Sequence, residues 1–295
     1  MVGRNLLDHQ ESKKYKIITP SSRELDLLDY EKLLYFLNKN KPDLIIHLAA
    51  KVGGIQANIN DPFLFLNLNL KIGLNMVNAS FENNIKKFIN VSSSCVYPSI
   101  YQEPIKENYL LQGPLEKTNE GYALAKIAVM KLCEYISNMN QGFFYKTLIP
   151  CNLYGKNDNF DLVNAHLIPA IIRKTSEAIK QNKDIEIWGN GSARREFMYA
   201  GDFADSIFYF LEKIEKMPNA INIGLGDDYS VYEYYKIIAE KLKFKGKFLY
   251  DLTKPDGMKR KLLCTSNLKK YSWKPKHSLS EGLDKTIEYF KKYYE

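Results

Sequence analysis

The stretch "KKFINVSSSCVYP", residues 86–98, decides the class of fold. A short run of strand-forming residues ends in three serines and a cysteine, so a buried strand is followed at once by polar side chains. In open parallel sheets the functional site lies beyond the carboxyl ends of the strands. We therefore expect Ser93 and Cys95 to lie at the site edge of such a sheet.

The segments around this strand alternate between strand-like and helix-like patterns. The predicted elements are a strand at "YKIIT" (15–19), a helix that begins at a capping Asp29, a strand in "PDLIIHLAA" (42–50), a helix across 61–83, a helix through 119–139 and a strand in "FFYKTLIP" (143–150). This order predicts an α/β fold in which residues 1–150 form a doubly wound parallel sheet with helices on both faces. Pro and Gly punctuate shorter elements beyond it, so residues 151–295 are predicted to be mainly a smaller α/β substrate-binding domain, with some segments returning to the first domain.

Composition narrows the class of function. The 295 residues are 45% hydrophobic and 26% charged, and no apolar run is long enough for a membrane span. No signal-peptide pattern is visible, so we expect a cytoplasmic protein. The net charge of +8 comes from scattered lysines, which favours an anionic small molecule over nucleic acid. The four cysteines are far apart and form no C-x-x-C pair, so neither a metal site nor a disulfide framework is predicted.

Tyr122 and Lys126 are four residues apart, which places them on one face of a helix. An ammonium beside a phenol is expected to lower the phenol's pKa and to make it a usable proton donor and acceptor. The sequence contains five Tyr-x-x-x-Lys pairs, so the spacing alone is weak evidence. Tyr122 differs from the others because its helix follows the strand that ends at Ser93 and Cys95.

Seven ordered segments resemble the GDP-L-fucose synthase family. They are "HLAAKVGGI" (47–55), "SSSCVYP" (92–98), "EGYALAKIAVMKLCE" (120–134), "NLYGKNDNF" (152–160), "NAHLIPA" (164–170), "WGNGSARREF" (188–197) and "KPDGMKRKLL" (254–263). Members are bifunctional GDP-4-keto-6-deoxymannose 3,5-epimerase/4-reductases of the extended short-chain dehydrogenase/reductase type. The resemblance covers essentially the whole chain and implies a Rossmann-type sheet.

The resemblance also implies the roles of individual residues. Ser93, Tyr122 and Lys126 match the reductase triad, while Cys95 and His166 match the acid/base pair of epimerisation. The implied cofactor contacts are Gly3, Ser22, Arg23, Val91, Ser92, Ser94, Lys126, Pro150, Asn152, Leu153 and His166. The implied contacts to a GDP-sugar are Lys174, Trp188, Arg195, Asp256 and Lys261. Related enzymes use NADPH and meet its 2′-phosphate with Arg or Ser, so NADP(H) is the expected cofactor and NADH the alternative.

The implied chemistry suits these residue types. A ketone at C4 acidifies the hydrogens at C3 and C5, and a thiol and an imidazole, with ordinary pKa values of about 8.5 and about 6.5, can exchange such protons near neutrality. The expected reaction converts GDP-4-keto-6-deoxy-D-mannose to GDP-L-fucose. Two alternatives are C4 reduction of a related GDP-4-keto-deoxyheptose, with or without epimerisation, and a catalytically impaired, truncated form. The resemblance also implies a homodimer formed through the 61–83 and 119–139 helices.

The opening "MVG" bears on the last alternative. In the family these residues close a glycine fingerprint of which Gly3 is the last glycine, so the first strand and two earlier glycines are expected to be missing. We expect this chain to bind NADPH poorly, and a chain extended upstream by ~10–15 residues, enough for one strand and its turn, to bind it normally.

Overall fold

The computed structural model describes residues 1–139, 141–162, 165–254 and 258–295. The helices of this part of the chain are α1 (Val2–Asp8), α2 (Tyr30–Asn40), α3 (Ile55–Asn60), α4 (Pro62–Glu82), α5 (Glu120–Met139), α6 (Leu167–Gln181), α7 (Ala200–Leu211), α8 (Val231–Leu242), α9 (Ser266–Lys269) and α10 (Leu279–Tyr294). The strands are β1 (Leu44–His47), β2 (Lys87–Val91), β3 (Phe144–Pro150), β4 (Asn152–Tyr154), β5 (Ile185–Trp188), β6 (Arg194–Arg195), β7 (Phe197–Tyr199), β8 (Ala220–Ile223), β9 (Tyr229–Ser230), β10 (Phe248–Asp251) and β11 (Arg260–Lys261).

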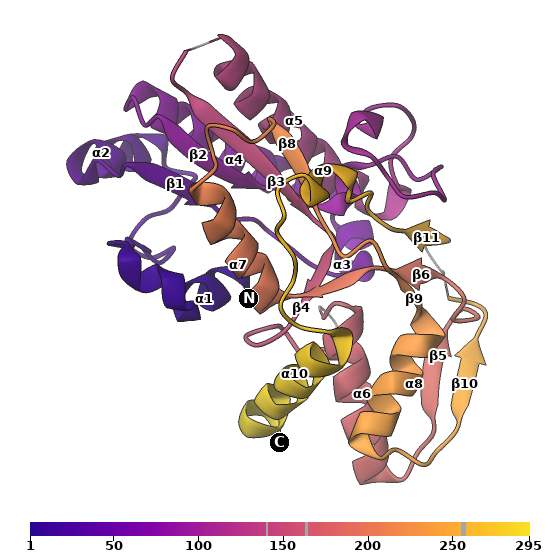
Figure 1. Cartoon of the computed structure of the whole chain (residues 1–295). Coiled ribbons are helices and arrows are strands. Elements are labelled where there is room, and N and C mark those ends of the chain that lie inside the picture. Colours follow the sequence, from indigo (N-terminus) through magenta and orange to yellow (C-terminus); the bar gives the residue numbers. More distant parts are fainter. Residues whose placement is uncertain (140, 163–164, 255–257) are drawn as a thin grey trace.

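The central sheet has the order β1-β2-β3-β8, and every neighbouring pair is parallel. Because parallel strands run in one direction, His47, Val91 and Pro150 end their strands at the same edge of the sheet. Helices cover both faces, with α4 and α5 on one side and α1 and α7 on the other (Figure 1). The expected doubly wound parallel sheet is confirmed.

The pleat of the strands explains this layering. Phe88 and Tyr145 lie in one apolar cluster with Val129 of α5, whereas the neighbouring Ile89 belongs to the cluster that contains Phe203 of α7. Successive side chains of a strand point to opposite faces, so each strand supplies apolar groups to both helix layers. The helices α4 and α5 pack closely, since a Cβ on Gly73 would lie 2.2 Å from Cγ2 of Val129.

The predicted helices form as expected, but the predicted strand at 15–19 is wrong. Asp29 caps α2 by accepting a hydrogen bond from the backbone N–H of Lys32 at 3.1 Å. Residues 16–20 are extended without regular structure, and Ile17 and Ile18 are exposed. A strand requires a neighbour that pairs with its backbone groups, and within the described chain no strand pairs with this segment.

The second half of the chain builds a separate apolar cluster from α6, α8, α10 and β5 (Figure 1). Two small sheets join it to the site: β11-β6-β9, and the parallel pair β4-β7. Some later segments pack with the first cluster, among them β8 in the central sheet and the side chain of Trp273. No helix in the described ranges is both long and apolar enough to cross a membrane.

Candidate active site

The first turns of α5 place Tyr122 and Lys126 beneath the carboxyl end of β2. The ammonium of Lys126 lies 5.8 Å from the centre of the Tyr122 ring and donates a hydrogen bond to the backbone oxygen of Val91 at 3.0 Å. Lys126 is only 6% exposed, and burial lowers its pKa to about 8. A buried ammonium that is bonded to a carbonyl rather than to a carboxylate keeps donors free for further oxygen atoms.

The environment of Tyr122 overturns the expected direction of its pKa. Burial raises the pKa of the phenol, and the neighbouring Cys95 raises it further, while a hydrogen bond with Ser93 opposes the change. The phenol therefore stays protonated at neutral pH, which suits a group that donates a proton. The spacing to Lys126 is as predicted, but desolvation is the largest influence on the pKa of the phenol.

Two donors from different parts of the chain surround the sulfur of Cys95. The residue follows Ser93, which caps a short 3-10 turn (Ser94–Val96) and accepts a hydrogen bond from the Cys95 N–H at 3.3 Å. The side-chain amide of Asn119 donates to the sulfur at 3.6 Å, and the ammonium of Lys261 lies 3.4 Å from it. Lys261, expected to contact the GDP-sugar, thus contacts the thiol directly.

His166 precedes the first turn of α6 and lies on the same side of the site as Lys261. Although part of the residue is exposed, desolvation by the surrounding protein lowers the pKa of its imidazole, and the charge of Lys261 lowers it further. Lys261 therefore acts on both members of the predicted acid/base pair. The sequence analysis missed Asn119, although its position three residues before Tyr122, immediately before the same helix, is a usable signal.

The predicted substrate residues fall into two places. Lys174 of α6 lies 5.4 Å from the ring centre of Trp188, and Lys254 approaches the same ring to 5.5 Å. The exposed indole and the two lysines together form an aromatic surface flanked by positive charge. A purine nucleoside diphosphate would suit such a surface. Arg195 lies at the neighbouring small sheet and donates to the backbone oxygen of Met258 at 2.6 Å. Asp256 lies outside the described residues.

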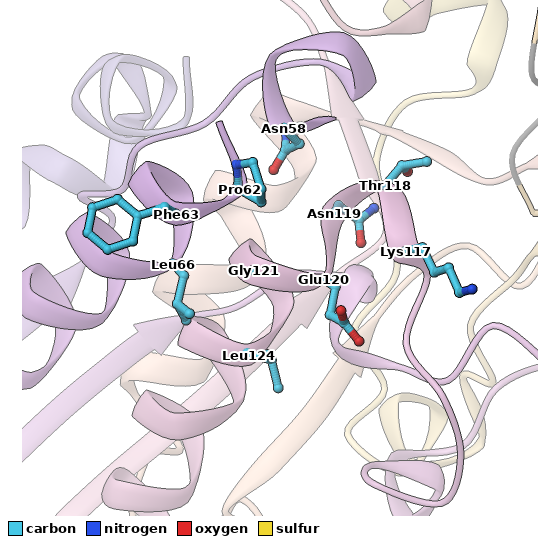
Figure 2. A pocket seen from close by; sticks show the side chains of 10 residues that line it. All are labelled: Asn58, Pro62, Phe63, Leu66, Lys117, Thr118, Asn119, Glu120, Gly121 and Leu124. Carbon is cyan, nitrogen blue, oxygen red and sulfur yellow. The ribbon is translucent and has the colours of Figure 1, made fainter. Parts of the chain in front are cut away.

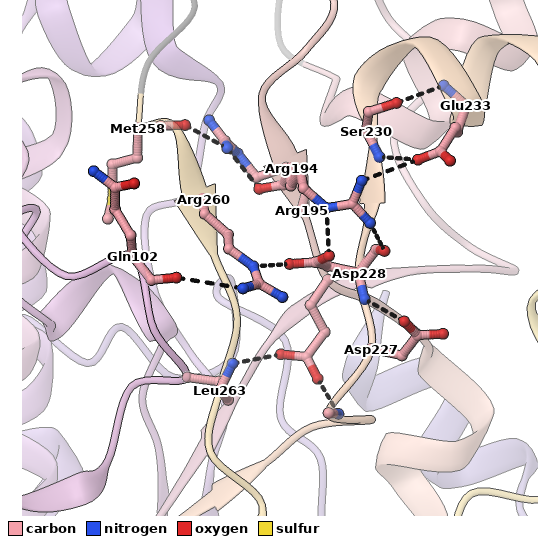
Figure 3. Close-up of polar contacts among 12 residues, drawn as sticks. Gln102, Arg194, Arg195, Asp227, Asp228, Ser230, Glu233, Met258, Arg260 and Leu263 are labelled. Carbon is pink, nitrogen blue, oxygen red and sulfur yellow. Dashed lines mark hydrogen bonds and ion pairs between the residues drawn. The ribbon is translucent and has the colours of Figure 1, made fainter.

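A buried ionic network holds the strands that carry Arg195 and Lys261 (Figure 3). The carboxylate of Asp228 is 2% exposed and pairs with Nε of Arg194 at 2.6 Å and Nε of Arg260 at 2.5 Å. It thereby connects β6 and β11, whose register places Lys261 opposite Arg195. The network fixes the strand bearing Lys261.

Glu196 connects the backbone after β8 to the backbone after β11. Its carboxylate accepts hydrogen bonds from the N–H groups of Gly226 at 2.8 Å and Leu263 at 2.9 Å. A Cβ on Gly224 would lie 2.6 Å from one of these carboxylate oxygens, so a side chain there would clash with the network. Burial raises the pKa of Glu196 to about 7, although its backbone hydrogen bonds act in the opposite direction.

The other expected cofactor contacts gather mainly at the carboxyl edge of the sheet. Val91, Ser92, Ser94, Pro150, Asn152 and Leu153 end or directly follow β2 and β3. Gly3 begins α1 beside Leu48, to which its Cβ would be 3.6 Å away. Ser22 and Arg23 lie exposed in a turn, and no regular element precedes them at 16–20. The buried ammonium of Lys126 and the phenol of Tyr122 fit the hydroxyl groups of a cofactor ribose.

A hollow of about 360 Å³ opens between the N-terminal ends of α4 and α5 (Figure 2). Asn119 lines it from the 3-10 turn just before α5, Gly121 from the first turn of α5, and Pro62 and Phe63 from α4. Asn119 reaches from this wall to the sulfur of Cys95, and its buried side-chain oxygen has no hydrogen-bond partner within the described chain. The hollow therefore borders the candidate site.

A parallel sheet with Ser93, Tyr122 and Lys126 at its carboxyl edge defines a short-chain dehydrogenase/reductase of the extended type. Residues 1–224 match the model described as "NAD dependent epimerase/dehydratase family", and the chain belongs to that family.

Relatives of known activity agree with this placement. The chain is 53% identical over 291 residues to a GDP-L-colitose synthase of Yersinia pseudotuberculosis, covering 98% of this chain and 94% of that enzyme. It is 46% identical over 291 residues to a GDP-L-fucose synthase of Azorhizobium caulinodans, covering 98% and 93%. A solved GDP-mannoheptose C4 reductase from Campylobacter jejuni with NADP bound is similar at a TM-score of 0.87 and 29% identity, covering 98% and 95%.

Proposed function

We propose that this protein is an NADPH-dependent epimerase-reductase that converts GDP-4-keto-6-deoxy-D-mannose to GDP-L-fucose. One observation carries the proposal: the protonated phenol of Tyr122 lies beside Ser93 and Cys95, within one enclosed cluster. A reductase needs the phenol and the hydroxyl, whereas only an epimerase needs a thiol at that point. The relatives named GDP-L-fucose synthase support the same reaction.

The epimerisation half uses the two faces of the sugar ring. Cys95 and His166 are assigned to remove and return protons at C3 and C5, since they approach the cluster from different elements, the end of β2 and the start of α6. The hydroxyl groups of Ser93 and Tyr122 stabilise the negative charge that develops on the C4 oxygen while a neighbouring carbon lacks its proton. One oxygen-binding position thus serves both proton exchanges.

The reduction half uses the same oxygen-binding position. Bound NADPH supplies a hydride to a carbonyl carbon. Tyr122 protonates the resulting C4 oxygen, and Ser93 keeps that oxygen within reach of the phenol. Lys126 holds the cofactor ribose and orients Tyr122 from below, as its position between Val91 and the Tyr122 ring suits it to do.

The GDP moiety is assigned to the second cluster. Trp188 stacks against the base or sugar, and Lys174 and Arg195 neutralise the diphosphate. Asp256 is retained as a substrate contact on the resemblance. We assign residues 1–150 to the cofactor-binding domain and 151–295 mainly to the substrate-binding domain. Ser22 and Arg23 are assigned to the 2′-phosphate because they are exposed and offer a hydroxyl and a cation.

The test of this function is a comparison of three substrates. NADPH oxidation is followed with GDP-4-keto-6-deoxy-D-mannose, with its 3-deoxy counterpart and with a GDP-4-keto-deoxyheptose. The proposal predicts the highest kcat/KM for the first substrate and GDP-L-fucose as its product by NMR. A tenfold or greater preference for either of the other substrates would reassign the enzyme.

The 3-deoxy substrate is the second candidate because of the colitose synthase relative, which is 53% identical to this chain. Colitose is 3-deoxyfucose and has no stereocentre at C3. An enzyme of that specificity therefore inverts C5 alone, by proton exchange at that carbon. The retained pair of Cys95 and His166 suits either substrate, and the comparison above separates them.

We also propose a cytoplasmic homodimer. The outer faces of α4 and α5 carry large apolar side chains, including Phe63, which is 73% exposed, and Met139, which is 81% exposed. Leu124 and Tyr135 continue the α5 face at helical spacing. Pairing of two such faces would bury these side chains in a bundle of four helices and would place the hollow of Figure 2 at the rim of the interface.

A further inference from the structure

Lys261 is a buried cation whose hydrogen-bond partner is a sulfur. Its side chain is 9% exposed, and no carboxylate of the described chain forms an ion pair with it. Its ammonium donates a hydrogen bond to Sγ of Cys95 at 3.4 Å. An uncompensated buried ammonium is costly, so the arrangement calls for an anion at the position that it faces.

The strand bearing Lys261 is held at several points. Its neighbour Arg260 pairs with Asp228, and the N–H of Ile105 donates to the backbone oxygen of Leu262 at 2.9 Å. Lys261 thus has fixed backbone on both sides. A lysine that contacts only a flexible diphosphate would not need to be buried against a thiol.

Asn119 is a second donor to the same sulfur. Its amide nitrogen donates to the same sulfur at 3.6 Å, while its buried side-chain oxygen is left without a partner in the described residues. Two N–H donors from different elements thus converge on one sulfur.

We propose that Lys261, together with Asn119, is a positioning residue that stabilises the thiolate of Cys95 and so makes this sulfur the group that removes a proton from the sugar. The inference rests on the proposed function in taking Cys95 as a proton-exchanging group. In the step, the C–H bond next to the ketone breaks, its proton forms an S–H bond, and its electron pair becomes the enolate. His166 in its protonated form donates a proton to the same carbon from the opposite face, the enolate electron pair forms the new C–H bond, and neutral imidazole is left.

Lys261, Tyr122 and His166 are the charged and titratable groups near the thiol of Cys95. Lys261 faces it from β11, and Tyr122 faces it from α5 as a protonated phenol. His166 faces Lys261 from the start of α6, and burial, together with the charge of Lys261, lowers the pKa of its imidazole. The same ammonium therefore favours an anionic sulfur and disfavours the protonated imidazole.

The test titrates the thiol without substrate or cofactor. In a Cys264→Ser background, the rate of alkylation of Cys95 by iodoacetamide is measured against pH, with the modified peptide identified by mass spectrometry. Lys261→Met and Asn119→Asp should each raise the pH midpoint of alkylation, the former by about one unit or more. Lys261→Arg should stay near the parent, and Lys259→Met, an exposed lysine two residues away, should match it.

Unchanged midpoints in both Lys261→Met and Asn119→Asp, with melting temperatures like that of the parent, would overturn the inference. Asn119→Asp keeps the test decisive if Lys261→Met fails to fold. Because the titration needs no sugar, a wrong substrate assignment does not affect it. Conversely, proton exchange at C3 and C5 with unshifted midpoints would leave the proposed function intact and refute this role of Lys261. A lysine that only binds the diphosphate would raise KM in Lys261→Met and leave the midpoint unmoved.

Discussion

Lys126 is buried, and burial disfavours the charged form of its ammonium group. Its pKa of about 8 means that the ammonium is present below that pH and is lost as the pH rises through it. Since the ammonium orients Tyr122 and binds ribose hydroxyls, we expect kcat/KM for NADPH-dependent reduction to fall above about pH 8. The pH–rate profile of the free enzyme is the measurement.

Lys126→Arg provides the control for this profile, because a guanidinium stays charged throughout the accessible range. The variant is expected to be slower but to lose the descending limb. A limb that persists unchanged in Lys126→Arg would assign the titration to another group.

Tyr122 separates the two halves of the reaction. Tyr122→Phe should lower the rate of reduction by about 10²–10⁴-fold, the usual contribution of a proton donor. Exchange of substrate protons with D₂O should continue at a reduced rate, because Cys95 and His166 remain. Tyr35→Phe is the matched control, since Tyr35 belongs to another Tyr-x-x-x-Lys pair and is exposed on α2. Equal losses of reduction and exchange in Tyr122→Phe would contradict separate roles.

At this scale the sequence predicts which residues meet but not what burial does to them. Ser93, Cys95, Tyr122 and Lys126 lie together as the motifs implied. The predicted direction of the Tyr122 pKa shift was wrong, because helical spacing indicates that an ammonium is near but gives no measure of how far the phenol is desolvated. Lys261 lies at the predicted site but contacts the thiol. This contact is set by the pairing of β11 with β6. Strands of only two residues carry too little pattern to be predicted from a sequence.

At the scale of elements, Asp228 links strands that would otherwise be held by few backbone bonds. Burial alone would raise the pKa of its carboxyl group, but Arg260 and Arg194 lower it overall. Asp228→Asn should destabilise the fold by about 1–3 kcal/mol at pH 7, because charged hydrogen bonds to two half-exposed guanidinium groups are lost. Chemical denaturation measures the difference.

The pH dependence of that difference follows from the sign of the shift. A carboxylate with a lowered pKa stabilises the fold above the ordinary value of 3.8 and loses this contribution as the pH falls below it. The gap between parent and Asp228→Asn should therefore close in acid. Asp284→Asn, whose carboxylate pairs with Lys241 at the surface, should cost little at any pH.

The elements themselves show where sequence patterns succeed and fail. Long amphipathic helices such as α4 and α5 carry their own signal in caps and periodicity and are predicted within a residue or two of their ends. The run at 15–19 has the composition of a strand but no pairing partner in the described chain. Composition alone does not form a strand, because the backbone groups need a neighbouring strand for hydrogen bonds. The return of β8 to the first sheet depends on long-range packing that local patterns do not contain.

At the scale of the whole molecule, the apolar faces of α4 and α5 predict self-association. Phe63→Glu places a charge in the proposed interface and should convert a dimer to a monomer in analytical ultracentrifugation. Leu249→Glu, at an exposed leucine on β10, is the matched control and should leave the association state unchanged. A parent that sediments as a monomer would refute the proposed homodimer.

The central claim is that one cluster of side chains both epimerises and reduces the same sugar. The most direct measurement is NMR of the product formed from GDP-4-keto-6-deoxy-D-mannose and NADPH in D₂O. The account predicts GDP-L-fucose that carries deuterium at C3 and C5 and the protium delivered from NADPH at C4. A reduced product that retains protium at both C3 and C5, with their configuration unchanged, would contradict it.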